Sequence, residues 1–260
     1  MACTSRIVLA SALLAFAPTL FAWDATVQEA VARVAQEWVR PGALRISRYL
    51  MGPEFNLKDA AGWTDSQTQA RPEVEAWRSI TIPPNAKKVV LPRDCPVGDC
   101  VTAKVRAFEG VVRLAVKDKE RRQEAFRFFL NLVVDLHQPL NAGFPPDQGG
   151  DRVVLIGGEE IALYDLWESR LFAGADPEEL AGRIRALITD EKAERWSQGT
   201  LRDWTWETHQ AAVHVAYDGV GVDSPQPVDE AYLDRARETA ELQLAKAAVR
   251  LAFLIERIWP

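Results

Sequence analysis

Polar residues that could form a functional site gather in residues 128–151, FFLNLVVDLHQPLNAGFPPDQGGD. Asn131 and Asp135 are four residues apart, so on a helix they share one face, while apolar neighbours can anchor another face in a core. Pro139 ends or kinks this helix, and Asn141 follows where a loop begins. Amide and carboxylate oxygens of this kind could ligate a hard cation. An ordinary amphipathic helix with its exit loop explains the same residues without a site.

The elements that must position these residues are predicted to be helices. Apolar residues recur at helical spacing in several segments, and Asp176 followed by Pro177 is typical of a helix N-terminus. We expect helices over residues 27–38 (ended by Pro41), 101–115, 128–138, 177–187, 205–217 and 229–258. The fold class is therefore all-α, a single mainly helical domain.

Two regions depart from this pattern. Residues 54–100 contain Pro72, Pro83, Pro84, Pro92 and Pro96, so we expect mostly loop there. Residues 153–156 and 161–163 are short apolar runs on either side of a glycine pair, which predicts one small β-hairpin, with a glycine-rich loop as the alternative.

The N-terminus has the features of a secretory signal peptide over residues 1–22. A short basic start at Arg6 precedes an apolar run that is too short to span a bilayer, and Ala22 offers a small residue for cleavage. We therefore expect a mature chain of residues 23–260, secreted or periplasmic, beginning at Trp23. We find no candidate transmembrane span and no internal repeat in the sequence.

Charge and cysteine content narrow the functional classes. The 260 residues carry a formal net charge of −6, and removal of Arg6 with the signal peptide makes the mature chain more negative. Non-specific nucleic-acid binding needs clustered Lys and Arg, so binding of nucleic acid is predicted to be weak and to require a local site.

The two cysteines of the mature chain, Cys95 and Cys100, lie in the segment DCPVGDC. In an oxidising compartment this close pair predicts a small disulfide-closed loop. A redox motif is less favoured because it is usually C-x-x-C, and a structural zinc site is less favoured because it needs further ligands nearby.

The order of motifs along the chain resembles the zinc-dependent single-strand-specific nucleases of fungi, plants and bacteria, which are related in fold to zinc phospholipase C. The matching segments are Trp23 at the predicted mature terminus, residues 63–65, WRSITIPP (77–84), DCPVGDCVTAKV, FFLNLVVDLHQPLNAG, the glycines at 149–150, LYDLWES (163–169), TWETH (205–209) and QLAKAAVRLA. The resemblance covers nearly the whole mature chain. It implies a helical fold with three zinc ions in a cleft, which bind and hydrolyse a phosphodiester.

The same resemblance implies a set of metal-ligand positions, and this sequence departs from it at most of them. In the family pattern the ligands are the N-terminal tryptophan, five histidines and three aspartates. Trp23, Asp65 and Asp135 are retained, and other residue types stand at the remaining positions: Gln28, Arg78, Asn131, Asn141 and Tyr164 replace the histidines and Glu168 replaces an aspartate. None of the three histidines of the chain, His137, His209 and His214, falls at a ligand position, and His137 is expected to be a core or supporting residue.

Arg78 is the most informative of these replacements. A guanidinium is always charged and cannot coordinate a cation, so beside Asp65 and Asp135 it would take up the volume of one metal and neutralise both carboxylates. We expect a salt-bridge network there; an Arg78 side chain turned toward solvent is the alternative.

The sequence is compatible with three candidate functions, each from a different functional class. The first is a pseudo-nuclease that keeps the fold without zinc, with no cofactor and an unknown ligand in the former active-site cleft. The second is a hydrolase with altered metal use, with a single Ca²⁺ or Mg²⁺ near Asn141, Tyr164 and Glu168. The third is a residual endonuclease or phosphodiesterase activity. Whether the protein is an enzyme is therefore left open by the sequence.

Overall fold

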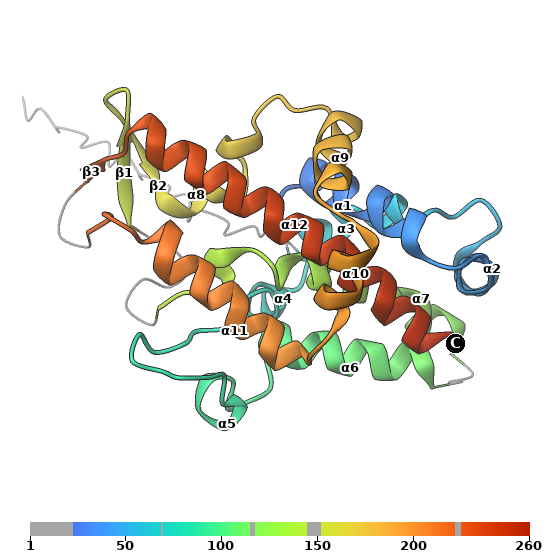
Figure 1. Cartoon of the computed structure of the whole chain (residues 1–260). Helices are drawn as coiled ribbons and strands as arrows, with labels where there is room; N and C mark the ends of the chain where they lie inside the picture. The colour runs from blue at the N-terminus through green and yellow to red at the C-terminus, as the bar shows by residue number, and fades with distance from the viewer. Residues whose placement is uncertain (1–22, 69, 115–117, 145–151, 222–224) are drawn as a thin grey trace, which may run out of the picture.

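The longest helix, α12 (Glu230–Ile258), runs diagonally across the molecule in Figure 1, and α1, α6, α7, α9 and α10 pack against it. Asp229 caps its N-terminus by accepting a hydrogen bond from the Tyr232 N–H at 2.8 Å. Small buried residues such as Ala240 and Ala248 let neighbouring helices approach closely, while Leu244 and Leu251 fill the core. This helix is therefore the centre of the packing.

The computed structural model describes residues 23–68, 70–114, 118–144, 152–221 and 225–260, and these form a mainly helical domain with a small three-stranded sheet. The remaining helices are α1 (Ala25–Trp38), α2 (Pro41–Met51), η1 (Leu57–Ala60), α3 (Trp63–Thr68), α4 (Glu73–Ala76), α5 (Leu91–Asp94), α6 (Val101–Arg113), α7 (Lys119–Asp135), η2 (Pro139–Ala142), α8 (Leu163–Glu168), η4 (Arg170–Phe172), α9 (Pro177–Ala186), α10 (Asp190–Ser197), α11 (Leu201–Ala211) and η5 (Ala212–Ala216). The predicted signal peptide, residues 1–22, and the paired glycines at 149–150 lie outside the described residues. Among the helices that are described, none combines the length and apolar character needed to cross a membrane.

The polar residues of α7 lie in the interior of the protein. Every residue from 128 to 143 is buried, so the second half of α7 is covered on all sides. Asn131 and Asp135 do share one face, but that face packs against other elements, including α1 and α3. Tertiary packing therefore encloses the polar face of this segment as well as its apolar one, unlike the ordinary amphipathic helix that was the alternative to a site.

The predicted hairpin is confirmed. Strands β1 (Val153–Ile156) and β2 (Glu159–Ala162) pair antiparallel, with Val153 opposite Ala162 and Ile156 opposite Glu159. Gly157 and Gly158 form the two-residue turn with φ of 58° and 90°, a backbone conformation that favours glycine. A short third strand, β3 (Gln226–Pro227), which was not predicted, pairs parallel with β1 and gives the strand order β2-β1-β3.

Three of the predicted boundaries need correction. The helix predicted over residues 128–138 begins at Lys119, where Asp118 caps it, and ends at Asp135. Residues 54–100 are not mostly loop, because η1, α3, α4 and α5 fit between the prolines. The helix predicted over residues 205–217 begins earlier, at Leu201, because Thr200 and Asp203 form a capping box, and its last turn is the π-helical η5.

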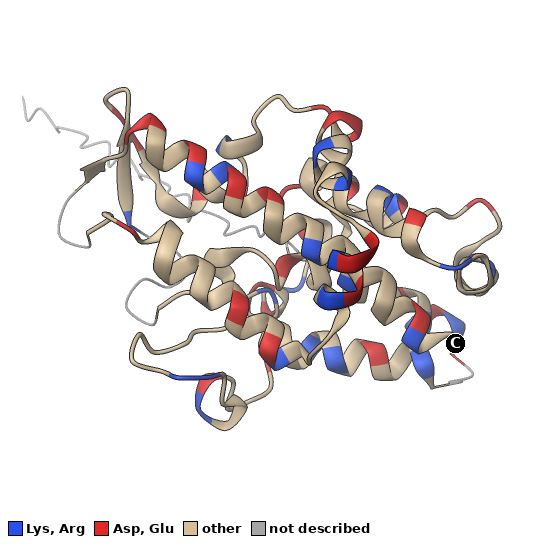
Figure 2. Ribbon diagram, viewed as in Figure 1, with Lys and Arg blue, Asp and Glu red and all other residues tan. Residues whose placement is uncertain are grey.

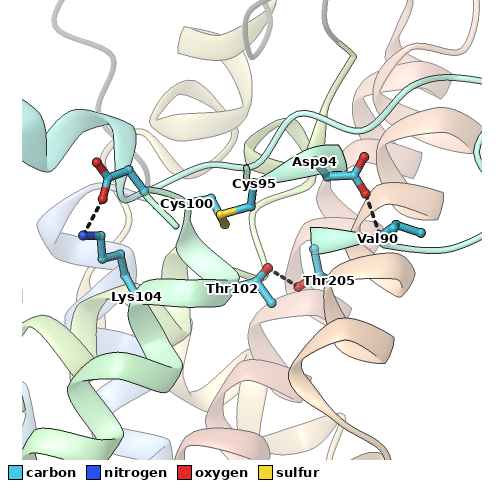
Figure 3. Close-up of a disulfide and its surroundings, with 8 residues drawn as sticks. Val90, Asp94, Cys95, Cys100, Thr102, Lys104 and Thr205 are labelled. Atoms are coloured by element: carbon cyan, nitrogen blue, oxygen red, sulfur yellow. Dashed lines mark hydrogen bonds and ion pairs between the residues drawn. A yellow bond between two sulfur atoms is a disulfide. The ribbon is translucent and has the colours of Figure 1, made fainter. Parts of the chain in front are cut away.

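The disulfide predicted between Cys95 and Cys100 is present, with the two Cα atoms 5.8 Å apart (Figure 3). It closes the turn between α5 and α6, and Cys100 is the residue that precedes α6. Close by, the hydroxyls of Thr102 on α6 and Thr205 on α11 are joined by a buried hydrogen bond of 2.7 Å (Figure 3). The cross-link and this hydrogen bond together fix α5 and α6 against α11.

Candidate functional site

A buried ion-pair cluster centres on Arg78, which lies just after α4. Its Nη1 donates to Asp65 Oδ1 of α3 at 2.6 Å, and its Nε donates to Asp135 Oδ2 at the end of α7 at 2.9 Å. The side chain of Arg78 is 2% exposed and that of Asp135 is 0% exposed, whereas Asp65 is 24% exposed. The guanidinium therefore lies between the two carboxylates and is not turned toward solvent.

The charges of this cluster depend on one another. Burial by itself lowers the pKa of Arg78, but the carboxylates of Asp135 and Asp65 outweigh burial and raise that pKa, so the guanidinium stays protonated. Burial raises the pKa of Asp135 to about 7 and also raises the pKa of Asp65, and in both cases Arg78 opposes the shift. Removal of the arginine would leave two carboxyl groups in a poorly solvated place.

Side-chain amides complete this half of the cluster. Gln28 of α1 donates through Nε2 to the Trp23 carbonyl oxygen at 3.2 Å and to Asp135 Oδ1 at 3.0 Å. Asn131 donates through Nδ2 to the Ala60 carbonyl oxygen at 2.7 Å, and its Oδ1 accepts from the Thr64 N–H at 3.4 Å. Both amides are thus held by internal hydrogen bonds.

A second group adjoins the first through the backbone of Asp135. Asn141 Nδ2 donates to the Asp135 carbonyl oxygen at 2.9 Å, and Asn141 Oδ1 accepts from the Tyr164 hydroxyl at 3.1 Å. Glu168, one turn after Tyr164 on α8, is buried and forms no hydrogen bond or ion pair with the described part of the chain. Burial raises the pKa of its carboxyl to about 9, against an opposing effect of Arg78, so the carboxyl holds its proton at neutral pH.

The structure therefore brings the nine positions named from the sequence into one buried region, through the bonds above and the electrostatic coupling of Glu168 to Arg78. Sequence reasoning missed Glu75, whose pKa is raised by burial and opposed by Arg78. Its Oε2 and the Nη2 of Arg78 are buried without a hydrogen-bond partner among the described residues. Glu75 lies in the short helix α4, three residues before Arg78, and this spacing is the signal that could have identified it. Across the described ranges, no group of three His, Cys, Asp or Glu side chains is arranged to hold a metal ion.

The histidines lie outside this cluster. His137 is buried, with Nδ1 2.8 Å from the Val133 carbonyl oxygen and Nε2 3.0 Å from Arg250 Nη1, so Nδ1 carries the proton and Nε2 accepts from the guanidinium. It is the satisfied core histidine that the sequence predicts. His209 Nδ1 contacts the Ala142 carbonyl oxygen at 2.6 Å, and His214 is exposed on η5.

Comparison with known proteins shows which family this chain is similar to. A family model described as S1/P1 nuclease matches residues 23–260. Nuclease S1 of Aspergillus oryzae is 23% identical over 282 residues, covering 96% of each chain. Endonuclease 2 of Arabidopsis thaliana is 26% identical over 95% of this chain and 94% of its own, and Nuclease P1 of Penicillium citrinum is 24% identical over 91% and 97%. The similarity thus extends along the whole described fold.

Proposed function

Because this chain belongs to the S1/P1 nuclease family, we propose that it is a family member in which zinc-dependent phosphodiester hydrolysis has been lost and the fold serves a binding or structural role. The resemblance implies three zinc ions bound at positions between Trp23 and Glu168. In this chain a network of an ion-paired arginine and side-chain amides stands in their place. The cluster then stabilises the protein and carries no chemistry.

The single observation that carries the proposal is the position of Arg78. Its guanidinium contacts Asp65 at 2.6 Å and Asp135 at 2.9 Å, the two carboxylates that the resemblance assigns to a metal. A guanidinium has no lone pair for a cation and stays protonated, so a zinc ion could bind these carboxylates only after the arginine had moved away. The arginine is enclosed, which makes that movement costly.

The other positions fit zinc no better. Zinc in proteins takes imidazole nitrogen, thiolate or carboxylate, and amide oxygens are weak donors to it. The oxygens of Asn131 and Asn141 already accept internal hydrogen bonds, and the amide nitrogen of Gln28, not its oxygen, faces Asp135. The residues present do not fit a zinc cluster, so we derive no catalytic step through one.

We further propose that residues 1–22 are a cleaved signal peptide and that residues 23–260 are the mature nuclease-like domain, secreted or periplasmic. The family match begins at Trp23, and the Cys95–Cys100 disulfide supports an oxidising compartment. N-terminal sequencing of the exported protein tests this proposal, with Trp23 as the expected first residue.

One observation favours altered metal use as a second candidate. The Tyr164 hydroxyl, which bonds Asn141 Oδ1 at 3.1 Å, is electrostatically coupled to the buried carboxyl of Glu168, and Ca²⁺ prefers oxygen ligands. Melting in the presence of millimolar CaCl₂ and of NaCl at equal ionic strength tests this candidate. A rise in melting temperature that is specific to calcium and lost in Glu168→Gln would establish an ion site. Equal melting in both salts is the result expected for the pseudo-nuclease.

The decisive experiment measures metal content and cleavage on one sample. Mature protein is purified without chelator, its metals are counted by elemental analysis, and single-stranded DNA cleavage is assayed alongside an Asp65→Asn variant. We expect less than one zinc ion per chain and no cleavage above that of the variant. Two or three zinc ions, with cleavage that a chelator and Asp65→Asn both abolish, would overturn the proposal.

A further inference from the structure

A surface groove lies apart from the buried cluster, where α5, α6, α11 and the end of α12 meet. Its first part has a volume of about 360 Å³ and runs from Lys88 to Trp206, and its second, of about 450 Å³, continues to Arg113 and Arg257. The two parts share Leu91, Thr200 and Arg202 as lining residues, so they adjoin one another on the same surface. We call it the α6–α11 groove, defined by Lys88, Arg106, Arg113, Arg202, Trp206 and Arg257.

The groove is basic although the chain as a whole is acidic. Lys88, Arg106, Arg113, Arg202 and Arg257 line it, whereas the full sequence has a formal net charge of −6. Two carboxylates also line it, Glu109 and Asp203. In Figure 2 the basic segments of α6 and of the first turn of α11 are drawn in blue. A local concentration of positive charge of this kind attracts phosphate groups.

Most of the positive charge in the groove is free to bind a ligand. Arg257 is held by Glu109 through bonds of 2.8 and 2.6 Å. Arg106, Arg113 and Arg202 are exposed and form no ion pair within the described chain. Asp203 accepts hydrogen bonds from Thr200, which lower the pKa of its carboxyl and keep it ionised, so it offsets part of the charge of Arg202. The three arginines exceed what this one carboxylate can balance.

The start of α11 adds backbone donors to the same surface. Thr200 caps the helix and satisfies the Asp203 N–H, which leaves the N–H groups of Leu201 and Arg202 without a partner inside the helix. The positive end of the helix dipole points in the same direction. Backbone N–H groups beside free arginines form a favourable place for a phosphate oxygen.

The walls of the groove are fixed in position. The disulfide of Cys95 and Cys100 closes the α5–α6 turn, and the bond between Thr102 and Thr205 ties α6 to α11 (Figure 3). Thr102 is itself a lining residue of the second part. The partly buried Trp206 is a lining residue of the first part, and the centroid of its ring lies 5.1 Å from that of His209.

From this arrangement we propose that the α6–α11 groove binds single-stranded nucleic acid, with its arginines and the α11 N-terminus on successive phosphates and Trp206 stacked on a base. A row of cations beside an aromatic ring is the usual way to bind a single strand without reading its sequence. The cations of the groove come from several elements, which suits several phosphates better than one. The inference gives the proposed binding role a ligand, but it does not require that zinc chemistry be absent.

The test is fluorescence anisotropy of a labelled twelve-nucleotide oligothymidine with the mature protein over a series of salt concentrations. Gel electrophoresis of the recovered probe shows whether it stayed intact, so cleavage would be detected separately from binding. The groove variant is Arg106→Gln/Arg202→Gln. The control Arg45→Gln/Arg121→Gln removes the same charge from exposed positions outside the groove. Because all four side chains are exposed, melting temperatures close to that of the wild type are expected.

We expect the wild type to bind the probe, the groove variant to bind on the order of tenfold more weakly, and the control to match the wild type. Loss of two phosphate contacts should lower the slope of log K against log salt by about 1.4, at ~0.7 per phosphate of a single strand. Trp206→Leu should weaken binding without changing this slope. No binding by the wild type, or equal losses in groove and control variants, would overturn the proposal. Equally tight binding of inorganic polyphosphate, with no effect of Trp206→Leu, would overturn the assignment to nucleic acid.

Discussion

Replacement of Arg78 by leucine is the most direct perturbation of the buried cluster. Leucine retains part of the apolar stem but removes the cation that lies between Asp65 and Asp135. The carboxylate of Asp135 is completely buried, and within the described ranges it would keep only the hydrogen bond from Gln28. The charge of Asp65 is partly relieved by solvent, because its side chain is 24% exposed.

The expected cost is about 3–5 kcal/mol of unfolding free energy, the range for removal of one partner from a buried ion pair. Most of it comes from Asp135. Without the arginine the pKa of Asp135 rises further, so the folded protein holds a proton that the unfolded chain, with an ordinary carboxyl pKa, has released. Stability of the variant therefore falls as the pH rises from about 4 to 8, and the deficit relative to wild type shrinks in acid.

Urea denaturation at pH 5 and pH 8 measures both effects. The double variant Arg78→Leu/Asp135→Asn removes both charges and should regain most of the lost stability. Arg185→Leu is the matched control: Arg185 bonds Glu37 at 2.8 and 2.6 Å, but the two side chains are 40% and 45% exposed, so about 1 kcal/mol or less is expected. If Arg78→Leu costs no more than Arg185→Leu, the cluster is not the structural replacement proposed here.

Three further predictions concern other parts of the chain. Burial and Arg250 lower the pKa of His137 to about 3, so the wild-type protein loses stability as the pH falls from about 6.5 toward 3. The variant His137→Gln lacks this titrating group, so in acid titrations followed by circular dichroism it should lose less stability than the wild type, by about 2 kcal/mol at pH 5. Cys95→Ala/Cys100→Ala opens a short loop and should cost about 2 kcal/mol in urea denaturation, whereas an unchanged midpoint would show that the turn is held without the cross-link. A methyl group at Gly143 would overlap the Tyr217 hydroxyl, so Gly143→Ala should lower the melting temperature in calorimetry by an amount equivalent to about 1–3 kcal/mol, and Gly182→Ala, where a Cβ meets open space, is its control.

The sequence predicts the helices well where their signals are local. The N-cap at Asp176 and Pro177 marks the start of α9, and the glycine pair marks the hairpin. Strand β3 has no such signal, because two residues paired to a distant strand leave no periodicity. Residues 54–100 were misjudged since the prolines there start or separate short helices, as Pro92 does in α5.

The candidate site likewise has parts that the sequence predicts and parts that it does not. The contacts of Arg78 with Asp65 and Asp135 agree with the expectation drawn from the resemblance, because all three occupy its ligand positions. The hydrogen bonds of Gln28 and the unpaired carboxyl of Glu168 depend on side-chain orientation, which a pattern of residues does not specify. The α6–α11 groove could not be predicted, because its arginines come from helices that are far apart in the sequence.

The position of α12 has a consequence for the order of folding. Helix α1 buries its apolar residues Val27, Val31 and Val34 in a core to which α9 and α12 contribute. The core contacts of α1, the first helix of the described chain, are therefore complete only after α12, the last helix, has packed against it. Contacts between segments so far apart in the sequence form slowly. A ribosome-bound or partly translocated chain would hold α1 with its apolar face uncovered. Emergence of the C-terminal segment, and not of any earlier one, should set the moment at which the protein becomes resistant to protease.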